Sequence, residues 1–368
     1  MPTSRRTIGL GLLGLAALSP SAVRAANSDP AGAAPGQRVR VLSTTDQSTV
    51  QPLIDAFEKR HAGLQVDYRQ LGSMELMESF LADDSRADGR AVGKGVGGGA
   101  DVLWSSAMDL QIKLVNDGHA QSYESPHARQ LPRWAVWKYE AYGTTYEPVG
   151  IVYHRPSLSP AELPRTHEAL AALLRDDVPR FRGRVSTYDI ERAGLGFLIA
   201  ACDALATPAY WELVKALGRC QANLHADTRA MLEEVAAGRS LLAYNVLGAY
   251  AEVFARSHPQ LGVVYLSDYT LVASRVAFIA RRAPNVPGAR AWLDHLLSPQ
   301  GQQWLQDAGG FYGVRTDASP PRPELGLGRR LGDAARPIAL GPGLMAHLDR
   351  STHDALLKRW RREFTHSP

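Results

Sequence analysis

The chain has 368 residues, of which 45% are hydrophobic and 21% are charged, a composition typical of a soluble globular protein with enough length for two lobes. Its formal net charge is +4, but Arg5, Arg6 and Arg24 lie close to the N-terminus. The rest of the chain carries 38 basic and 37 acidic side chains, a net charge of +1. This balance argues against a polybasic nucleic-acid-binding protein.

The N-terminus has the features of an export signal. Arg5 and Arg6 precede an apolar run, Ile8 to Leu18, and Val23 and Ala25 are small residues at the positions that a signal peptidase reads. We therefore expect a signal peptide at 1–25, export by the Sec or twin-arginine route, and a soluble protein in the periplasm. The apolar run is too short to span a membrane. Residues 26–37 are rich in Ala, Gly and Pro and predict a flexible leader.

The first half of the mature chain alternates strands and helices. Alternating apolar residues predict a strand at 38–42 that ends in hydroxyl-bearing residues, and apolar spacings of three and four predict a helix after it. A second strand is expected at 64–69. A helix at 71–81 follows, with Met74, Met77 and Leu81 on its core-facing side.

The stretch from Asp101 to Tyr123 predicts a third strand, a turn at Ser105-Ser106 and a helix that begins near Met108. Hydroxyls and free backbone N–H groups at such a turn can bind a small ligand, because ligands sit at the carboxyl ends of strands in open α/β sheets. The alternative is that Ser105 only caps the helix.

The second half continues the α/β pattern. We expect strands at 150–154, 184–186, 241–244 and 261–266, and a strongly β-forming run at 269–279. The periodicity also predicts helices, at 166–174, from 195, at 207–217, 228–236, 289–297 and 299–306, and a last one at 351–364.

The chain contains two cysteines, Cys202 and Cys220. In an oxidising periplasm they could form a disulfide, and the alternative is two buried thiols. We expect no metal site from them, since a structural zinc needs more ligands.

No catalytic motif stands out. The chain has neither a Gly-x-Ser-x-Gly elbow nor a His-Glu-x-x-His motif, and its eleven histidines are dispersed. We therefore expect a binding protein without a cofactor, and a hydrolase is the least favoured class.

Four segments, together with the export signal, carry a family resemblance: WSSAMDLQIKLVNDG, GTTYEPVGIVYHRPSL, SRVAFIARRAPN and AWLDHLLSPQGQQWL. With these segments the chain resembles bacterial periplasmic solute-binding proteins of ABC transporters. The resemblance is to the group that binds ferric iron, phosphonates and phosphoglycerate. It implies a type II, two-lobe α/β periplasmic binding protein in which each lobe is an open α/β sheet and two crossover strands join the lobes. Mapped onto this chain, lobe 1 is 38–148 plus 270–368 and lobe 2 is 149–269.

The resemblance also implies a ligand site at the strand-to-helix turns of both lobes and at the crossovers. Arg192 would donate two hydrogen bonds to a carboxylate or phosphate, and the alternative is a surface salt bridge to Glu191 or Asp189. The implied ligand-binding residues are Thr44, Thr45, Ser105, Ser106, Tyr146, Glu147, Tyr188, Asp189, Arg192, Tyr244, Asn245 and Tyr269.

The expected ligand is a small oxyanion, namely a phosphate ester, a phosphonate or a carboxylate. Ferric binders of this group typically use two adjacent tyrosines, which this chain lacks, so a ferric complex is the second choice. The implied partner is an ABC permease or, alternatively, a membrane sensor kinase, and we expect a monomer that binds no nucleic acid.

Overall fold

The computed structural model describes residues 37–87, 99–307, 310–317 and 331–365. The predicted signal peptide, the leader up to residue 36 and residues 88–98, which belong to a Gly-rich stretch of the sequence, lie outside the described residues. Among the described residues, no helix is both long and apolar enough to cross a membrane.

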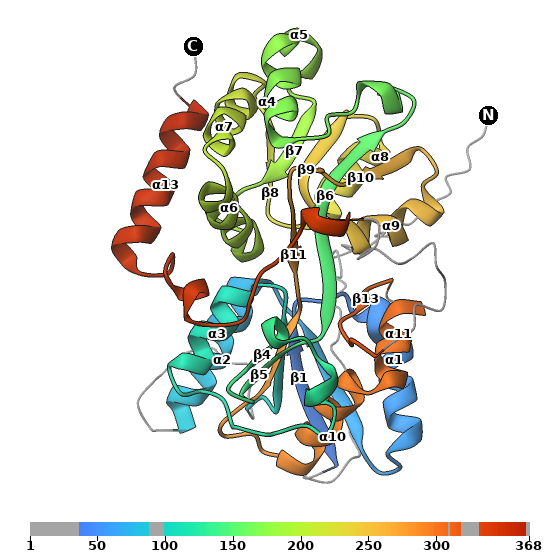
Figure 1. The fold of residues 1–368 in the computed structure, drawn as a ribbon. Coiled ribbons are helices and arrows are strands. Elements are labelled where there is room, and N and C mark those ends of the chain that lie inside the picture. Colours follow the sequence, from blue (N-terminus) through green and yellow to red (C-terminus); the bar gives the residue numbers. More distant parts are fainter. Residues whose placement is uncertain (1–36, 88–98, 308–309, 318–330, 366–368) are drawn as a thin grey trace, which may run out of the picture. The chain divides into compact units, whose positions relative to one another are not determined.

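Two sheets organise the chain, one in each lobe (Figure 1). In the first sheet the parallel strands β1, β2 and β3 are joined at one side by an antiparallel β12. Its order is β2 (Gln65–Gln70), β1 (Arg38–Ser43), β3 (Val102–Ser105), β12 (Val276–Ile279), β5 (Ala141–Gly143) and β4 (Val136–Trp137). The second has the order β14 (Ala335–Pro337), β11 (Thr270–Ala273), β6 (Thr145–His154), β9 (Leu242–Leu247), β7 (Val185–Tyr188) and β8 (Asn223–His225), and β10 (Leu261–Val264) and β13 (Tyr312–Gly313) also pair with β6.

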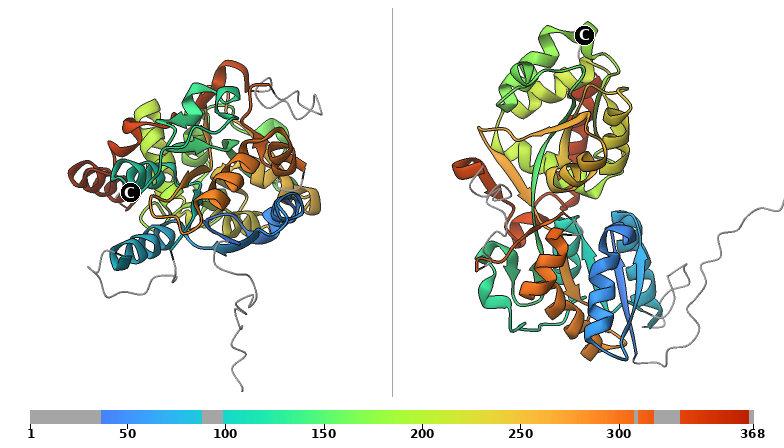
Figure 2. Two further views of the ribbon diagram at one scale, coloured as in Figure 1. Left: turned by 90° about the horizontal axis from the view of Figure 1, so that it is seen from below. Right: turned by 90° about the vertical axis from the view of Figure 1, so that its right-hand side faces the viewer.

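Helices cover the two sheets, and Figure 2 shows them from two further directions. Lobe 1 contains α1 (Gln47–Arg60), α2 (Ser73–Ala87), α3 (Met108–Asn116), α10 (Val286–Leu297) and α11 (Pro299–Asp307). Lobe 2 contains α4 (His167–Asp176), α5 (Val178–Phe181), α6 (Gly194–Ala206), α7 (Ala209–Arg219), α8 (Thr228–Ala236) and α9 (Gly248–Ser257).

Two strands cross between the lobes, as expected. The long strand β6 runs antiparallel to β11 (Figure 1). Pro148 and Glu147 of β6 pair with Val272 and Ala273 of β11. The β-forming run at 269–279 is not one strand, because it breaks at Ser274 and Arg275 between β11 and β12. The break turns the Arg275 side chain inward, where it is 4% exposed.

Helix α2 confirms two of the three residues predicted for its core-facing side. Met77 and Leu81 are partly buried and pack against the core beside the fully buried Leu76 and Phe80. Met74, in the first turn, is 40% exposed, so that part of the prediction was wrong. Helix α1 buries Val50, Leu53, Ile54 and Phe57, which is the predicted face.

The C-terminal helix α13 (Arg350–Thr365) packs against α7, which corrects its assignment to lobe 1. The Arg359 guanidinium lies 3.9 Å from the centre of the Trp211 ring. A methyl group at Gly218 of α7 would come within 1.9 Å of the Phe364 carbonyl oxygen, so the two helices touch. The chain therefore returns to lobe 2 after the second crossover strand.

The disulfide considered from the sequence is not formed, since Cys202 and Cys220 are both free. Cys202 lies on α6, while the Cys220 thiol follows α7 and donates to the Leu174 carbonyl at 3.3 Å. Burial raises the pKa of Cys202 to about 12 and that of Cys220 to about 11. Both cysteines are thus protonated thiols in separate surroundings.

Candidate ligand-binding cleft

A cleft of about 770 Å³ is lined by residues of both lobes. On lobe 1 it is lined by residues that follow β1, β2 and β3, and on lobe 2 by residues that follow β7, β8 and β9. It therefore lies at the carboxyl ends of strands, where open α/β sheets bind ligands. Its volume is in the range of small-molecule sites.

The N-termini of six helices meet at this cleft. Its lining includes the residues at the starts of these helices: Asp46 for α1, Ser73 for α2, Ser106 for α3, Ala193 for α6, Thr228 for α8 and Leu247 for α9. Each helix N-terminus carries unpaired backbone N–H groups and about half a positive charge. The cleft therefore has a main-chain potential that favours an anion.

Of the predicted ligand-binding residues, five line this cleft: Thr44, Thr45, Ser106, Tyr188 and Arg192. Seven do not: Ser105, Tyr146, Glu147, Asp189, Tyr244, Asn245 and Tyr269.

The two serines of the turn after β3 make different contacts. The Ser106 backbone N–H donates to Thr44 Oγ1 at 3.2 Å, which holds the two turns of lobe 1 together. Ser105 is 1% exposed and its Oγ accepts from the Ala107 N–H at 3.1 Å. Ser105 therefore stabilises the turn but does not cap α3, whose N-cap residue is Ala107 without a side-chain capping bond. Ser106 and Thr44 are the residues that line the cleft.

Arg275 lines the cleft and was missed by the sequence reasoning. Its Nη1 donates to Thr45 Oγ1 at 2.8 Å, and its Nε lies 3.1 Å from Oε1 of Glu147, which is 0% exposed. Thr145 donates to the same carboxylate at 2.7 Å. The pair joins the two crossover strands, which explains why Glu147 faces Arg275 and not the cleft.

Arg192 is exposed, and no hydrogen bond or ion pair of its side chain occurs with any other residue that the structure describes. The alternative partner Glu191 is taken by Arg361 of α13, whose Nε and Nη2 donate to the carboxylate at 2.6 and 2.5 Å. These bonds lower the pKa of Glu191. Asp189 accepts from the Glu191 backbone N–H. The guanidinium of Arg192 is thus available to a ligand.

Two tyrosines line the cleft, Tyr188 and Tyr250. The Tyr188 hydroxyl lies 2.5 Å from Thr228 Oγ1, and the Tyr250 hydroxyl donates to Asp46. Burial, together with the bond to the Asp46 carboxylate, raises the pKa of Tyr250 to about 12, and burial raises the pKa of Tyr188. Both are neutral phenols near pH 7, whereas a ferric ion binds phenolates. Within the described part of the chain, no three His, Cys, Asp or Glu side chains gather in a way that could hold a metal.

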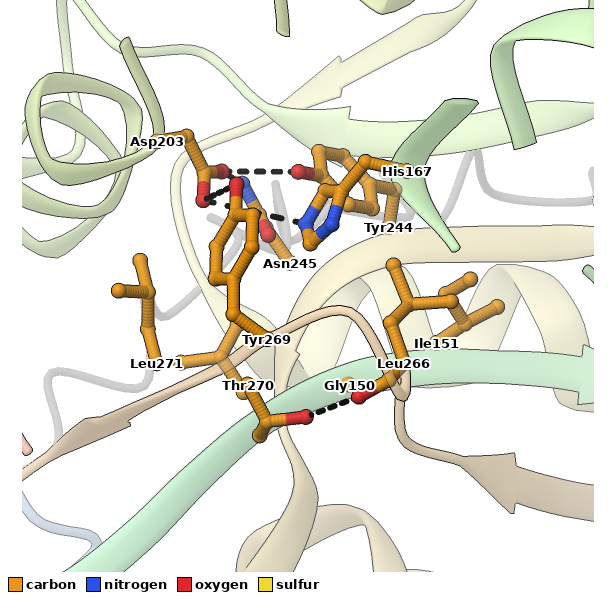
Figure 3. Close-up of a pocket in the computed structure, with 11 residues that line it drawn as sticks. Gly150, Ile151, His167, Asp203, Tyr244, Asn245, Leu266, Tyr269, Thr270 and Leu271 are labelled. Carbon is orange, nitrogen blue, oxygen red and sulfur yellow. Dashed lines mark hydrogen bonds and ion pairs between the residues drawn. The ribbon is translucent and has the colours of Figure 1, made fainter. Parts of the chain in front are cut away.

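Three predicted site residues lie around the buried carboxylate of Asp203 and do not line the cleft: Tyr244, Asn245 and Tyr269 (Figure 3). Tyr244 and Tyr269 donate to it at 2.8 Å and Asn245 at 2.9 Å. His167 stacks on the Tyr269 ring at 4.0 Å, and burial raises the pKa of Asp203. This network fixes the start of the second crossover strand to lobe 2.

Tyr146 is half-buried on β6, where its ring meets the Trp134 ring edge-on with centroids 6.3 Å apart. It packs in the structure and takes no part in lining the cleft.

The chain has clear structural relatives. The substrate-binding protein of an ABC transporter from Agrobacterium tumefaciens is 32% identical, with a TM-score of 0.81 over 89% of this chain and 94% of that chain. Iron-bound HitA from Pseudomonas aeruginosa is 16% identical, with a TM-score of 0.66 over 89% and 99%. AfuA from Actinobacillus pleuropneumoniae, with exogenous fructose-6-phosphate bound, is 16% identical, with a TM-score of 0.67 over 89% and 99%. The last two show similarity of fold alone.

No curated protein sequence matches this chain. The family model of bacterial extracellular solute-binding proteins matches residues 38–310. This match and the Agrobacterium relative agree with the two-lobe fold. The chain belongs to the bacterial extracellular solute-binding proteins, the periplasmic substrate-binding components of ABC transporters.

Proposed function

We propose that this protein captures a small oxyanion in the cleft and delivers it to an ABC permease. The candidate ligands are a phosphate ester, a phosphonate or a carboxylate. The observation that carries the proposal is the convergence of six helix N-termini around Arg192, the cleft arginine whose guanidinium has no ion-pair partner among the described residues. Helix N-termini and a bidentate guanidinium are the usual binding groups for such anions.

Most other charged side chains of the cleft have partners, and the Glu75 carboxylate accepts from the Gly72 N–H at 3.3 Å. Arg275 is paired with Glu147, and Arg229 lies 3.8 Å from Asp46. Asp227 accepts from the Ala230 N–H and caps α8. An incoming anion therefore competes with few existing ion pairs when it binds Arg192. Thr44, Thr45 and Ser106 line the cleft from the opposite lobe and bring hydroxyl groups to it, whereas their backbone N–H groups donate to Trp104, Ser43 and Thr44.

A ferric–anion complex is the second candidate, because Tyr188 and Tyr250 line the same cleft although they are distant in sequence. This ligand requires that both phenols lose their protons and exchange Thr228 and Asp46 for the metal. The raised pKa of Tyr250 opposes that exchange.

Thermal unfolding of the metal-free mature protein distinguishes these ligands. The panel holds phosphate, phosphonates, phosphoglycerates, di- and tricarboxylates, and ferric citrate. A ligand at about a hundred times its dissociation constant stabilises the folded state by about 2.7 kcal/mol, which raises Tm by a few degrees. We expect a shift with an anion in the presence of a chelator. A shift that requires iron would contradict the oxyanion assignment.

A membrane sensor kinase is the alternative partner, since a transporter and a sensor both recognise lobe closure. Deletion of the gene separates the two. Lost uptake of the ligand supports transport, whereas lost transcriptional induction with normal uptake would contradict it.

A further inference from the structure

The side chain of Asp46 is directed away from its own helix. Asp46 is the N-cap residue of α1, a position where Asp ordinarily accepts a hydrogen bond from the first turn, yet it makes no side-chain capping bond. Its Oδ1 instead accepts from Gln70 Nε2 at 2.7 Å. Its Oδ2 accepts from the Tyr250 hydroxyl on α9 of the other lobe. A favourable local interaction is therefore given up for a contact across the cleft.

Arg229 strengthens this contact. It lies in the first turn of α8, and its Nε is 3.8 Å from Asp46 Oδ2. The carboxylate of lobe 1 thus meets both a phenol and a guanidinium of lobe 2. A hydrogen bond between a neutral donor and a carboxylate is stronger than one between neutral groups, and the excess charge of Asp46 is offset by Arg229.

The lobes also touch at two other places. On α9, Glu252 accepts from Tyr312, which lies on β13 beside the lobe 1 end of β6. At the N-terminus of α6, a methyl group on Gly194 would lie 3.1 Å from Leu110 and 3.3 Å from Ser73 of lobe 1. The lobes are therefore in close contact beside the cleft, and Asp46 and Tyr250 lie in the lining itself.

We propose that Asp46, Tyr250 and Arg229 form an interlobe latch that holds the two lobes closed over the cleft and sets the ratio of closed to open protein. Tyr250 is the donor of the latch, Asp46 is its acceptor and Arg229 orients the carboxylate. These are positioning residues for lobe closure. The inference depends on the motion of two lobes and rests on the proposed oxyanion, since a ferric ligand would take the Tyr250 hydroxyl from Asp46.

The latch can be tested in the absence of any ligand by measuring the distance between the lobes. Nitroxide labels are placed at Lys59→Cys on α1 and Arg175→Cys on α4, two exposed positions, in a background with Cys202→Ala and Cys220→Ala. Double electron–electron resonance then gives the distance distribution. Loss of one hydrogen bond to a charged group changes an equilibrium about 10- to 100-fold. Tyr250→Phe should therefore raise the ratio of open to closed protein at least tenfold.

A matched control is available inside lobe 1. Tyr123 donates to the Asp294 carboxylate at 2.7 Å, so Tyr123→Phe removes the same kind of bond without crossing the cleft. We expect Tyr123→Phe to leave the distance distribution unchanged. Asp46→Ala removes the contacts to both Tyr250 and Arg229, so it should open the lobes at least as much as Tyr250→Phe, and the double variant should be no more open than Asp46→Ala. An unchanged distribution for Tyr250→Phe, or equal opening by Tyr123→Phe, would overturn the latch and leave the proposed ligand class untouched.

Discussion

The buried ion pair between Arg275 and Glu147 makes a quantitative prediction about stability. Arg275→Ala removes the guanidinium that neutralises Glu147, a carboxylate that is 0% exposed. The Arg275 Nε and Glu147 Oε1 lie 3.1 Å apart, which at an effective dielectric constant of about 20 corresponds to about 5 kcal/mol. Removing one partner of a buried pair typically costs about 3–5 kcal/mol. The free energy of unfolding should fall by that amount at pH 7.

Equilibrium urea unfolding followed by circular dichroism measures this loss. Arg315→Ala is the matched control, because Arg315 is also buried but its partner Asp317 has a side chain that is 50% exposed. The carboxylate left by this variant is solvated, so the loss should be clearly smaller. The double variant Glu147→Leu/Arg275→Leu should also lose less than Arg275→Ala, because no charge remains buried. Equal losses for Arg275→Ala and Arg315→Ala would refute the reasoning.

Two further predictions concern α3 and α13. Burial raises the pKa of Asp109 on α3 from 3.8 to about 7, so its stabilising effect is complete below pH 3.8 and is lost as the pH rises through 7. Asp109→Asn should therefore raise the free energy of unfolding by up to about 4 kcal/mol at pH 8 and have little effect at pH 4. An equal gain in stability at both pH values would contradict this prediction. Gly218→Ala should lower the free energy of unfolding by about 1–3 kcal/mol and speed amide hydrogen exchange in α13, because the new methyl group would clash with the Phe364 carbonyl. Unchanged exchange would mean that α13 does not pack on α7.

The local elements of the fold follow from local patterns. The alternation in β1 and the three- and four-residue spacing in α1 and α3 lie within single segments, and the structure confirms these elements. The serine turn after β3 was also predictable, because a polar pair separates a strand from a helix. What the pattern could not decide was which hydroxyl of the pair faces the cleft.

The residues that depend on distant partners were not predictable. Glu147 lies on one crossover strand and Arg275 follows the other, so neither segment contains a signal of the pair. Tyr244 and Tyr269 are held by Asp203, a carboxylate inside an apolar helix. Both cases depend on buried polar groups finding partners, and only the packed structure determines which partners are close enough.

The placement of the last helix shows the same limit. The spacing within 350–365 predicts a helix with an apolar side, but any apolar surface of the protein could receive it. Arg361 and Glu191 identify the receiving surface as lobe 2, through a contact between distant segments.

The central claim is that Arg192 binds an anion in the cleft, and isothermal titration calorimetry of Arg192→Ala tests it most directly. The titrant is the anion that gives the largest thermal shift, and Arg182→Ala, which changes an exposed arginine elsewhere on lobe 2, is the control. Arg192 is exposed in the structure, so the full effect requires that the bound anion and the closed lobes bury the charge pair. In that case Arg192→Ala should weaken binding by about 2–5 kcal/mol, and the control should bind as the wild type does. Unchanged affinity in Arg192→Ala would remove this arginine from the site and contradict the claim.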